Sequence, residues 1–314
     1  MQIAIVLTPP TDQNFRWAAQ VGVTDYVARY NDANSYEKLA ATKAHAQSFG
    51  LRLAVVERYL PIDDIVHAGP AREENIEAIK TLLVNMGKLD VPVLCYNFMP
   101  ACDWTRTSVT APERGGAFTT AFDIAEMEAQ PDALPARSTA EQLWANLEYF
   151  INAIVPTAEA AGVTLAMHPD DPPLPSLSGN DQIMFSPECY DRLFSLNRSP
   201  ANAMCFCQGT FSEMGVDIPA TIRHFGSRIG YVHFRDVIGT ASNFVESFHD
   251  NGQTDMFAAM QAYADVGFAG AMRPDHVPKL DGEEGMDGYT ILGRLFAVGY
   301  IRGLMDAVRS PAGK

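Results

Sequence analysis

The chain has 314 residues, of which 47% are hydrophobic, and it carries a formal net charge of −15 at pH 7. This length is typical of one α/β barrel, and a field of this sign argues against nucleic-acid and anionic-membrane partners. No apolar run is long enough for a membrane span, and residues 1–7 resemble a first strand rather than a signal peptide, so we expect a cytoplasmic protein.

Short apolar runs alternate with helical stretches along the chain. The predicted strands are Ile3–Leu7, Tyr26–Ala28, Leu51–Val56, Val93–Asn97, Thr164–His168, Ala203–Cys207, Ile229–Phe234 and Ala269–Arg273. Predicted helices between them include Ser35–Ser48, Arg72–Met86, Ala140–Ala161, Thr254–Val266 and Tyr289–Val308. This alternation predicts a parallel sheet, and eight repeats ending in a helix favour a single (β/α)₈ TIM barrel over residues 1–314. Periodicity alone also permits an open, doubly wound sheet.

Two long insertions interrupt the alternation. Met99–Arg137 follows the fourth strand and is rich in Pro, Thr, Gly and Asp, whereas Pro169–Pro187 follows the fifth and is dense in Pro, Asp and Ser. Insertions at the carboxyl ends of barrel strands usually shape active sites. We therefore expect both segments to border the functional site.

Each of the last four strands ends at, or just before, a side chain that can bind a metal. These side chains are His168, Cys207, His233 and Asp275. Neighbouring strands lie about 5 Å apart, so four such groups at one height can converge on one ion. Taken singly, each has an ordinary structural interpretation as a hydrogen-bonded histidine, a packed cysteine or a capping aspartate. Their occurrence on consecutive strands favours a metal site, and the mixed donor set suits Mn²⁺, Fe²⁺, Co²⁺ or Zn²⁺ better than Mg²⁺ or Ca²⁺.

The five cysteines show no repeated spacing, and their odd number suggests reduced thiols. Cys205 lies two residues before Cys207 on the same face of its strand. We interpret Cys205 as a packing residue, because Cys-x-Cys is not a zinc-knuckle spacing.

Several segments resemble, in order along the chain, those of the mannonate dehydratase family. They are Cys95-Tyr-Asn-Phe-Met-Pro-Ala-Cys-Asp-Trp-Thr-Arg-Thr107, Met167-His-Pro-Asp-Asp-Pro-Pro173, Cys207-Gln-Gly209, Val232-His-Phe-Arg-Asp236, Phe244-Val-Glu-Ser-Phe-His-Asp250, Arg273-Pro-Asp-His276 and Gly293-Arg-Leu-Phe-Ala-Val-Gly-Tyr-Ile-Arg-Gly-Leu304. The resemblance implies a xylose-isomerase-like barrel and a carbon–oxygen lyase of hexuronate catabolism that dehydrates D-mannonate to 2-dehydro-3-deoxy-D-gluconate. It also implies Mn²⁺ on the four side chains named above, and an acid/base pair at His276 and Tyr289.

Arg235 is our first choice as partner of a substrate carboxylate, because an arginine buried beside the ligands requires an anion. Arg106 and Arg294 are further choices, with a solvated salt bridge as the alternative for each. Asp170 and its neighbour Asp171 are predicted to bind substrate hydroxyls or to orient His168, and Trp104 is predicted to cover the site. The alternative for His276 is an indirect role in supporting the metal. The alternative for Tyr289 is that it only begins the last helix.

Ser178–Phe185 departs from the family pattern because it lacks an arginine expected there, so a different aldonate is an alternative substrate. A sugar isomerase or epimerase on the same barrel is another alternative. Such enzymes typically use glutamates as ligands and bases, and no glutamate is expected at a strand end. A non-catalytic sugar-acid binder with a structural zinc is the third alternative. A small-molecule sugar acid and a homo-oligomer are the expected partners.

Overall fold

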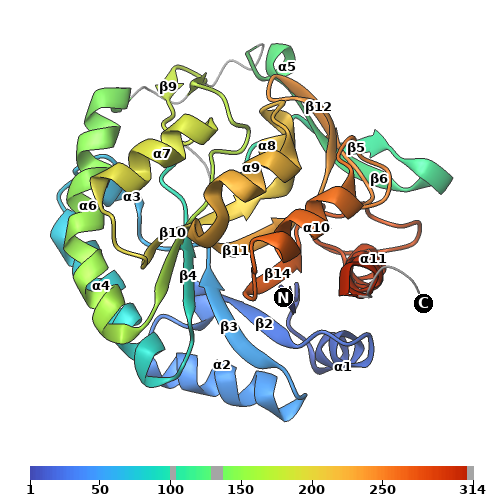
Figure 1. Ribbon diagram of the computed structural model, residues 1–314, viewed down its shortest axis with the longest axis horizontal. Coiled ribbons are helices and arrows are strands. Elements are labelled where there is room, and N and C mark those ends of the chain that lie inside the picture. Colours follow the sequence, from blue (N-terminus) through green and yellow to red (C-terminus); the bar gives the residue numbers. More distant parts are fainter. Residues whose placement is uncertain (100–103, 129–136, 310–314) are drawn as a thin grey trace.

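The computed structural model describes residues 1–99, 104–128 and 137–309 (Figure 1). Eight parallel strands close into a barrel in the order β1-β14-β11-β10-β7-β4-β3-β2. They are β1 (Gln2–Ile5), β2 (Asp25–Arg29), β3 (Arg52–Glu57), β4 (Val93–Tyr96), β7 (Thr164–Met167), β10 (Asn202–Cys207), β11 (Ile229–Phe234) and β14 (Ala271–Pro274). The predicted TIM barrel is confirmed, and the open sheet is ruled out because β1 pairs with both β2 and β14.

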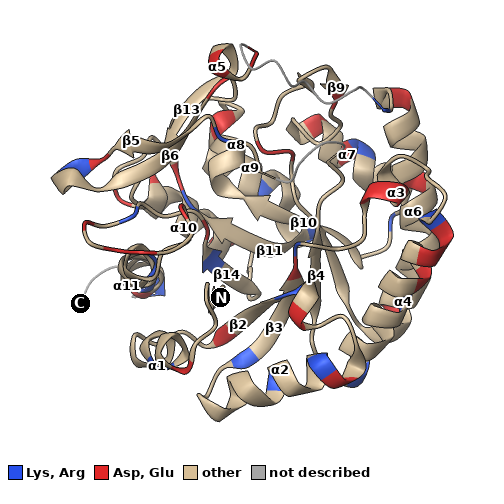
Figure 2. Ribbon diagram, turned by 180° about the vertical axis from the view of Figure 1, so that it is seen from behind, with Lys and Arg blue, Asp and Glu red and all other residues tan. Residues whose placement is uncertain are grey.

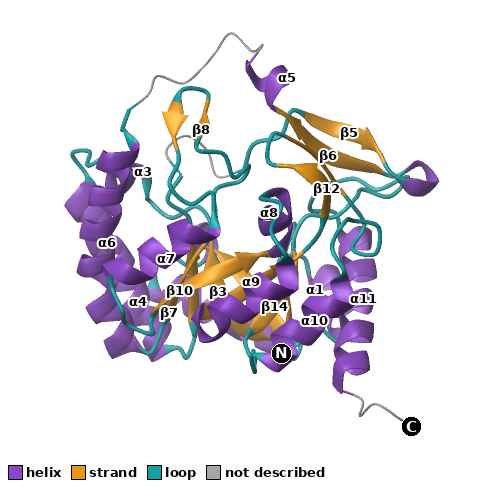
Figure 3. Ribbon diagram, turned by 45° about the horizontal axis from the view of Figure 1, so that its top comes forward, coloured by secondary structure: helices purple, strands orange, loops and turns teal. Residues whose placement is uncertain are grey.

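Helices cover the outside of the barrel (Figures 1 and 3). The α-helices are α1 (Asp12–Gln20), α2 (Tyr36–Ser48), α3 (Asp63–Val66), α4 (Arg72–Lys88), α5 (Ile124–Glu128), α6 (Ala140–Ala161), α7 (Pro187–Leu196), α8 (Gln208–Glu213), α9 (Ile218–Phe225), α10 (Met256–Asp265) and α11 (Ile291–Arg309). Of these, α5 stands above the barrel, apart from its outer layer (Figure 3). Basic and acidic residues are interspersed over this outer layer (Figure 2). Within the described ranges, none of the helices has the length and apolar character that a bilayer crossing requires.

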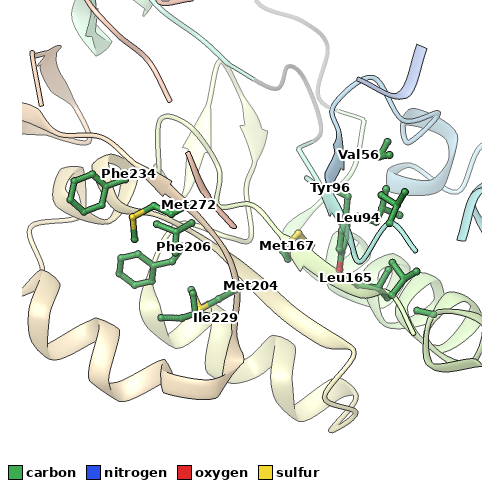
Figure 4. Close-up of a cluster of buried hydrophobic side chains, with 14 of the residues drawn as sticks. Val56, Leu94, Tyr96, Leu165, Met167, Met204, Phe206, Ile229, Phe234 and Met272 are labelled. Atoms are coloured by element: carbon green, nitrogen blue, oxygen red, sulfur yellow. The ribbon is translucent and has the colours of Figure 1, made fainter. Parts of the chain in front are cut away.

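Side-chain alternation divides the barrel strands between two apolar regions. On β4 and β7, Leu94, Tyr96, Leu165 and Met167 point outward into the main core between strands and helices (Figure 4). Residues of the opposite parity point inward, and Cys95, Ala166 and Cys205 belong to a smaller cluster in the barrel interior. The outward face stabilises the fold, at about 1.5–3 kcal/mol for each fully buried large side chain. The inward face is left to smaller and polar residues, so it can support a site at its carboxyl end.

Helix α6 illustrates how local sequence sets the frame of the site. Its N-terminus is a capping box, in which the Thr139 hydroxyl accepts from the Gln142 backbone and the Gln142 side chain accepts from the Thr139 backbone. It ends at Gly162, whose φ of 67° is left-handed and suits glycine. The chain then enters β7 directly, which fixes the direction of the strand that His168 follows.

A second, antiparallel sheet stands above the carboxyl end of the barrel (Figure 3). It consists of β5 (Ser108–Pro112) and β6 (Phe118–Asp123) from the first predicted insertion, paired through β6 with β13 (Asn243–Glu246) and β12 (Val237–Thr240). The second predicted insertion forms the short hairpin β8 (Ser176–Leu177) and β9 (Asn180–Asp181). Both insertions are confirmed, but the sequence analysis did not predict the third one, which follows β11.

Candidate active site

The four predicted metal ligands meet at the carboxyl end of the barrel. His168 follows β7, Cys207 ends β10, His233 lies in β11 opposite Cys207, and Asp275 follows β14. One ligating atom from each lies within 4.8 Å of the others. His168 Nε2 is 3.2 Å from His233 Nδ1, which is itself 3.5 Å from the Asp275 carboxylate. This donor set has the chemistry and spacing that a divalent transition-metal ion requires.

Neighbouring groups orient two of these side chains. The carbonyl of Pro169 lies 2.7 Å from His168 Nδ1, so that nitrogen donates to it and Nε2 faces the other ligands. Thr210 donates to the Cys207 sulfur at 3.1 Å. Burial opposes ionisation of the Cys207 thiol, but the charges of Arg235 and His168 outweigh it and hold its pKa well below the usual value. Cys207 is therefore available as a thiolate.

Arg235 does not line the cavity of this site and is fully buried (0% exposed). Its guanidinium donates to protein groups through every nitrogen; the acceptors, at 2.9–3.2 Å, are Asp171, Thr210, Glu213, Glu246 and Asp275. A Cβ at position 209 would lie 2.4 Å from this group, which explains the glycine of Cys207-Gln-Gly209. The geometry does not support the predicted contact between Arg235 and a substrate carboxylate, because protein carboxylates already supply the required anions.

Arg106 lies in the same buried network and is also absent from the cavity wall. It donates to Asp171 at 2.7 Å and to Glu246, the last residue of β13. Glu213 differs from the other acids of the network: burial and the charge of Asp171 raise its pKa well above the usual value despite Arg235. The arginines of this network thus face Asp171 and Glu246, whose pKa values their charges lower against burial, and Glu213, whose pKa is raised.

The predicted acid/base residues contact each other beside the ligand group. His276 Nε2 is 3.1 Å from the Tyr289 hydroxyl, which is 3.4 Å from an Asp275 oxygen. The other ring nitrogen of His276 is 2.8 Å from the Glu246 carboxylate, so Nδ1 carries the proton that it donates to Glu246. Gly288 has a φ of 73°, which permits the turn that brings Tyr289 back to His276.

A cavity of about 300 Å³ opens beside these groups. His168, His233, Asp275, His276 and Tyr289 form one side of its lining. Trp104 also lines it, with its ring centroid 5.0 Å from that of His276, and its buried Nε1 finds no acceptor among the described residues. Trp104 therefore lies at the wall of this cavity, beside His276.

Three arginines that were not selected from the sequence also line the cavity, namely Arg29, Arg58 and Arg273. Arg29 ends β2 and donates to Glu57 at 2.6 Å, and Arg58 follows β3. Arg58 and Tyr59 both have φ of 62°, a left-handed conformation that costs a non-glycine residue about 1–2 kcal/mol. Two such residues in succession at a cavity wall are typical of a functional segment.

Asp170 and Arg294 lie outside the cavity wall. One Asp170 oxygen accepts from the backbone of Ile183 and Met184 at 3.1 and 2.6 Å, and burial raises the pKa of this acid to about 7. Arg294 donates to the carbonyl of Val6 and lies 4.8 Å from the Tyr289 ring centroid. These contacts give Asp170 a role in holding the insertion and Arg294 a role behind Tyr289.

The expectation that no glutamate ends a strand is wrong. Glu57 is the last residue of β3, is buried, and lies 3.3 Å from His233 Nε2. Arg29 and Arg273 both donate to it and hold its pKa well below the usual value, against the effect of burial. The sequence signal was available, since Glu57 directly follows the predicted third strand. It is a paired anion that anchors His233, which differs from a free glutamate base.

The segment that departs from the family pattern, Ser178–Phe185, contributes no residue to the cavity lining. It includes β9 and, at Ile183 and Met184, the backbone N–H groups that donate to Asp170. The altered residues therefore do not form part of the cavity wall described here.

Comparisons with known proteins agree with this geometry. The chain matches a family model described as D-mannonate dehydratase (UxuA) over residues 15–139 and 135–313. It is 33% identical to a mannonate dehydratase of Oceanobacillus iheyensis over 313 residues, covering 91% of this chain and 89% of that protein. It is 34% identical to mannonate dehydratase 2 of Halalkalibacterium halodurans over 303 residues, covering 87% and 88%.

Among solved structures, a mannonate dehydratase from Streptococcus suis serotype 2 superposes with a TM-score of 0.91 at 31% identity, covering 100% of this chain and 96% of that one. A D-psicose 3-epimerase from Clostridium cellulolyticum superposes with a TM-score of 0.62 at 15% identity, covering 98% of each chain. The second likeness shows the barrel fold alone.

Proposed function

The chain belongs to the D-mannonate dehydratase family, and we propose from this premise that it removes water from D-mannonate to give 2-dehydro-3-deoxy-D-gluconate at the cavity described above. The observation that carries the proposal is the contact of a histidine–tyrosine pair with a group of four transition-metal donors. The Tyr289 hydroxyl lies 3.1 Å from His276 Nε2 and 3.4 Å from the Asp275 carboxylate.

We propose that His168, Cys207, His233 and Asp275 hold a divalent cation, with Mn²⁺ as first choice and Fe²⁺, Co²⁺ or Zn²⁺ as alternatives. The fit is supported by donor atoms that lie within 4.8 Å of one another and by the lowered pKa values of Cys207 and Asp275. Burial opposes both shifts, but the charge of Arg235 outweighs it at Cys207 and the charge of Arg273 outweighs it at Asp275. When bound, such a cation supplies positive charge that stabilises the anion formed when the proton at C2 is removed.

The buried charges around the proposed ligands also favour an anionic substrate. Four arginines there form ion pairs with carboxylates; they are Arg29, Arg106, Arg235 and Arg273, and their partners include Glu57, Asp171, Glu246 and Asp275. A divalent cation on the proposed ligands would add two positive charges beside these pairs, of which the Cys207 thiolate offsets one. The added charge favours an anionic ligand such as the carboxylate of a sugar acid.

The histidine–tyrosine pair can carry out both proton transfers of the reaction. Dehydration takes a proton from C2 and returns one to the hydroxyl that leaves C3. We propose that His276 accepts the first proton, because Glu246 stabilises the resulting imidazolium through Nδ1. Tyr289 then protonates the leaving hydroxyl, and its phenolate lies among the guanidinium groups of Arg29, Arg58 and Arg294, which are 4.8–6.0 Å from its ring. Proton transfer across the 3.1 Å contact between the two residues restores the starting state.

For substrate binding we propose Trp104 and Arg58, because both line the cavity and Trp104 has a donor without a protein acceptor. Arg106 and Arg235 are proposed to act through Asp171 and Glu246, as positioning residues. The cytoplasmic location and the homo-oligomeric state stay predictions.

The experiment that tests the function offers Mn²⁺-loaded protein a panel of aldonates, including D-mannonate, and measures formation of a 2-keto-3-deoxy acid. We expect Mn²⁺-dependent product from D-mannonate and its loss in Cys207→Ser and Tyr289→Phe. Product from another aldonate alone would keep the site and overturn the substrate. No product from any aldonate, with a tightly bound zinc ion, would overturn the dehydratase and favour the structural-metal alternative.

A further inference from the structure

A second group of metal-binding side chains lies inside the barrel, below the proposed ligands. Cys95 of β4, Cys205 of β10 and His233 of β11 each offer an atom within 4.8 Å of the other two. All three are buried, and both cysteines are free thiols. Neither thiol takes part in the proposed reaction. Cys205 therefore has a thiol neighbour from another strand, which its spacing from Cys207 in the sequence does not reveal.

The strand register explains why the two cysteines meet. Strand β7 lies between β4 and β10, and its Ala166 pairs with Cys95 on one side and with Ala203 on the other. Cys205 lies on the same face as Ala203, two residues further toward the carboxyl end. Because Ala166 carries only a methyl group, the thiols from the flanking strands can approach each other across it. Cys95, Ala166 and Cys205 all belong to the cluster of apolar residues in the barrel interior.

The chemistry of this group differs from that of the upper one. Two thiolates would neutralise a divalent cation without help from a carboxylate, which suits a buried position. Thiolate donors select soft or borderline ions such as Zn²⁺ and Cd²⁺, whereas Mn²⁺ prefers oxygen ligands. Two sulfurs on a tetrahedral zinc ion lie about 3.8 Å apart, so donor atoms already within 4.8 Å need to move only slightly.

An ion can reach this group from the cavity, because Cys95 and His233 both contribute to its lining. We propose that Cys95, Cys205 and His233 form a second site, selective for a thiophilic divalent cation such as Zn²⁺ or Cd²⁺. It shares His233 with the upper group. Nδ1 of His233 faces the upper donors and Nε2 faces Glu57, so an ion in the lower site either competes for this imidazole or displaces Glu57 from Nε2 and is bridged to the upper ion.

Cd²⁺ is the probe for the test, because each cadmium–thiolate bond adds charge-transfer absorption in the ultraviolet. The background is the full chain with Cys189→Ser and Cys102→Ser, of which Cys102 lies outside the described residues. One protein adds Cys207→Ser, which leaves the two thiols of the lower site. A matched protein adds Cys95→Ala and Cys205→Ala, which leaves the one thiol of the upper site. Absorption is measured against bound Cd²⁺ from equilibrium dialysis.

We expect the charge-transfer absorption per Cd²⁺ ion bound through a thiolate to be about twice as large in the Cys207→Ser protein as in the matched protein. The reason is that the first offers two thiolates to one ion and the second offers one. If the double variant fails to fold, as judged by circular dichroism, single Cys95→Ser and Cys205→Ser changes in the Cys207→Ser protein keep the test open. Each is then expected to halve the absorption per ion.

Absence of a cadmium–thiolate band in the Cys207→Ser protein would overturn the proposal, as would a band that survives both single changes undiminished. This readout does not involve turnover. Failure of the proposed dehydratase activity would be seen in the aldonate assay and would leave the binding result unaffected.

Discussion

Replacing Glu246 by glutamine tests how the network controls the acid/base histidine. The Glu246 carboxylate accepts from His276 Nδ1 at 2.8 Å and from Arg235 at 3.0 Å, and it also pairs with Arg106. Glutamine keeps the shape and one acceptor oxygen but removes the charge. Since Glu246 does not line the cavity, we expect the change to lower kcat and to leave KM nearly unchanged.

The magnitudes follow from the burial of the network. Without Glu246, Arg106 keeps Asp171 as its ion-pair partner, and Arg235 loses one of the carboxylates that face it. Breaking one buried charge pair in this way costs about 3 kcal/mol of unfolding free energy. Loss of imidazolium stabilisation at His276 removes most of a general-base contribution, which is about 10²-fold in kcat.

Glu213→Gln is the matched control, because Glu213 is equally buried and contacts the same guanidinium nitrogen of Arg235 at 3.1 Å. Burial and the charge of Asp171 raise the pKa of Glu213, whereas the pKa of Glu246 is lowered, so glutamine at position 213 is expected to change stability by less than about 1 kcal/mol. Turnover of D-mannonate and unfolding in urea are measured for both. Equal losses in the two variants would refute the charge argument, and wild-type kcat in Glu246→Gln would refute the orienting role.

Four further results are expected. Tyr289→Phe keeps the fold, judged by circular dichroism, but lowers kcat on D-mannonate at least about 10²-fold, because the hydroxyl that lies 3.1 Å from His276 is lost; unchanged kcat would exclude it as the acid. Trp104→Phe keeps the ring but removes the Nε1 donor, so KM should rise about tenfold while kcat changes little, and an unchanged KM would count against the contact. Arg235→Met leaves several buried acids uncompensated and should cost about 3–5 kcal/mol in urea unfolding; a neutral effect would contradict the network as described. Burial lowers the pKa of His249 to about 4, below its unfolded value of 6.5, so between these pH values the unfolded chain binds a proton more tightly than the folded one. The free energy of unfolding should therefore fall by about 3 kcal/mol as the pH drops from 6.5 to 4. Urea unfolding midpoints of His249→Gln should lack this part of the pH dependence, and an unchanged pH dependence would contradict the assignment to His249.

Much of the barrel and the ligand group could be predicted because strand periodicity is a local signal. Once β7, β10, β11 and β14 are recognised as adjacent parallel strands, the residues at their carboxyl ends must lie at the same rim of the barrel. His168 and Cys207 therefore meet although nothing near either of them in sequence specifies the other. The pairing order that closes the barrel supplies the rest.

The buried arginines show where this reasoning fails. An arginine on an inward face requires an anion, but sequence does not tell whether that anion is a substrate or a protein carboxylate. Arg235 finds its carboxylates on β13, on α8 and after β7, which come together only in the folded barrel. Glu57 was missed for a related reason, because its pairing with Arg29 and Arg273 depends on the order of β2, β3 and β14 around the barrel.

The antiparallel sheet gives the acid/base pair its geometry. His276 follows β14, but the carboxylate that fixes its Nδ1 proton comes from β13, and Arg106, which holds the same carboxylate, lies between β4 and β5. Strand β13 is anchored by its pairing with β6, so Glu246 cannot move independently of the segment that carries Arg106. A histidine after β14 without this support could present either nitrogen to the cavity. The insertions therefore determine which nitrogen faces Tyr289, while the barrel strands determine where the proposed metal lies.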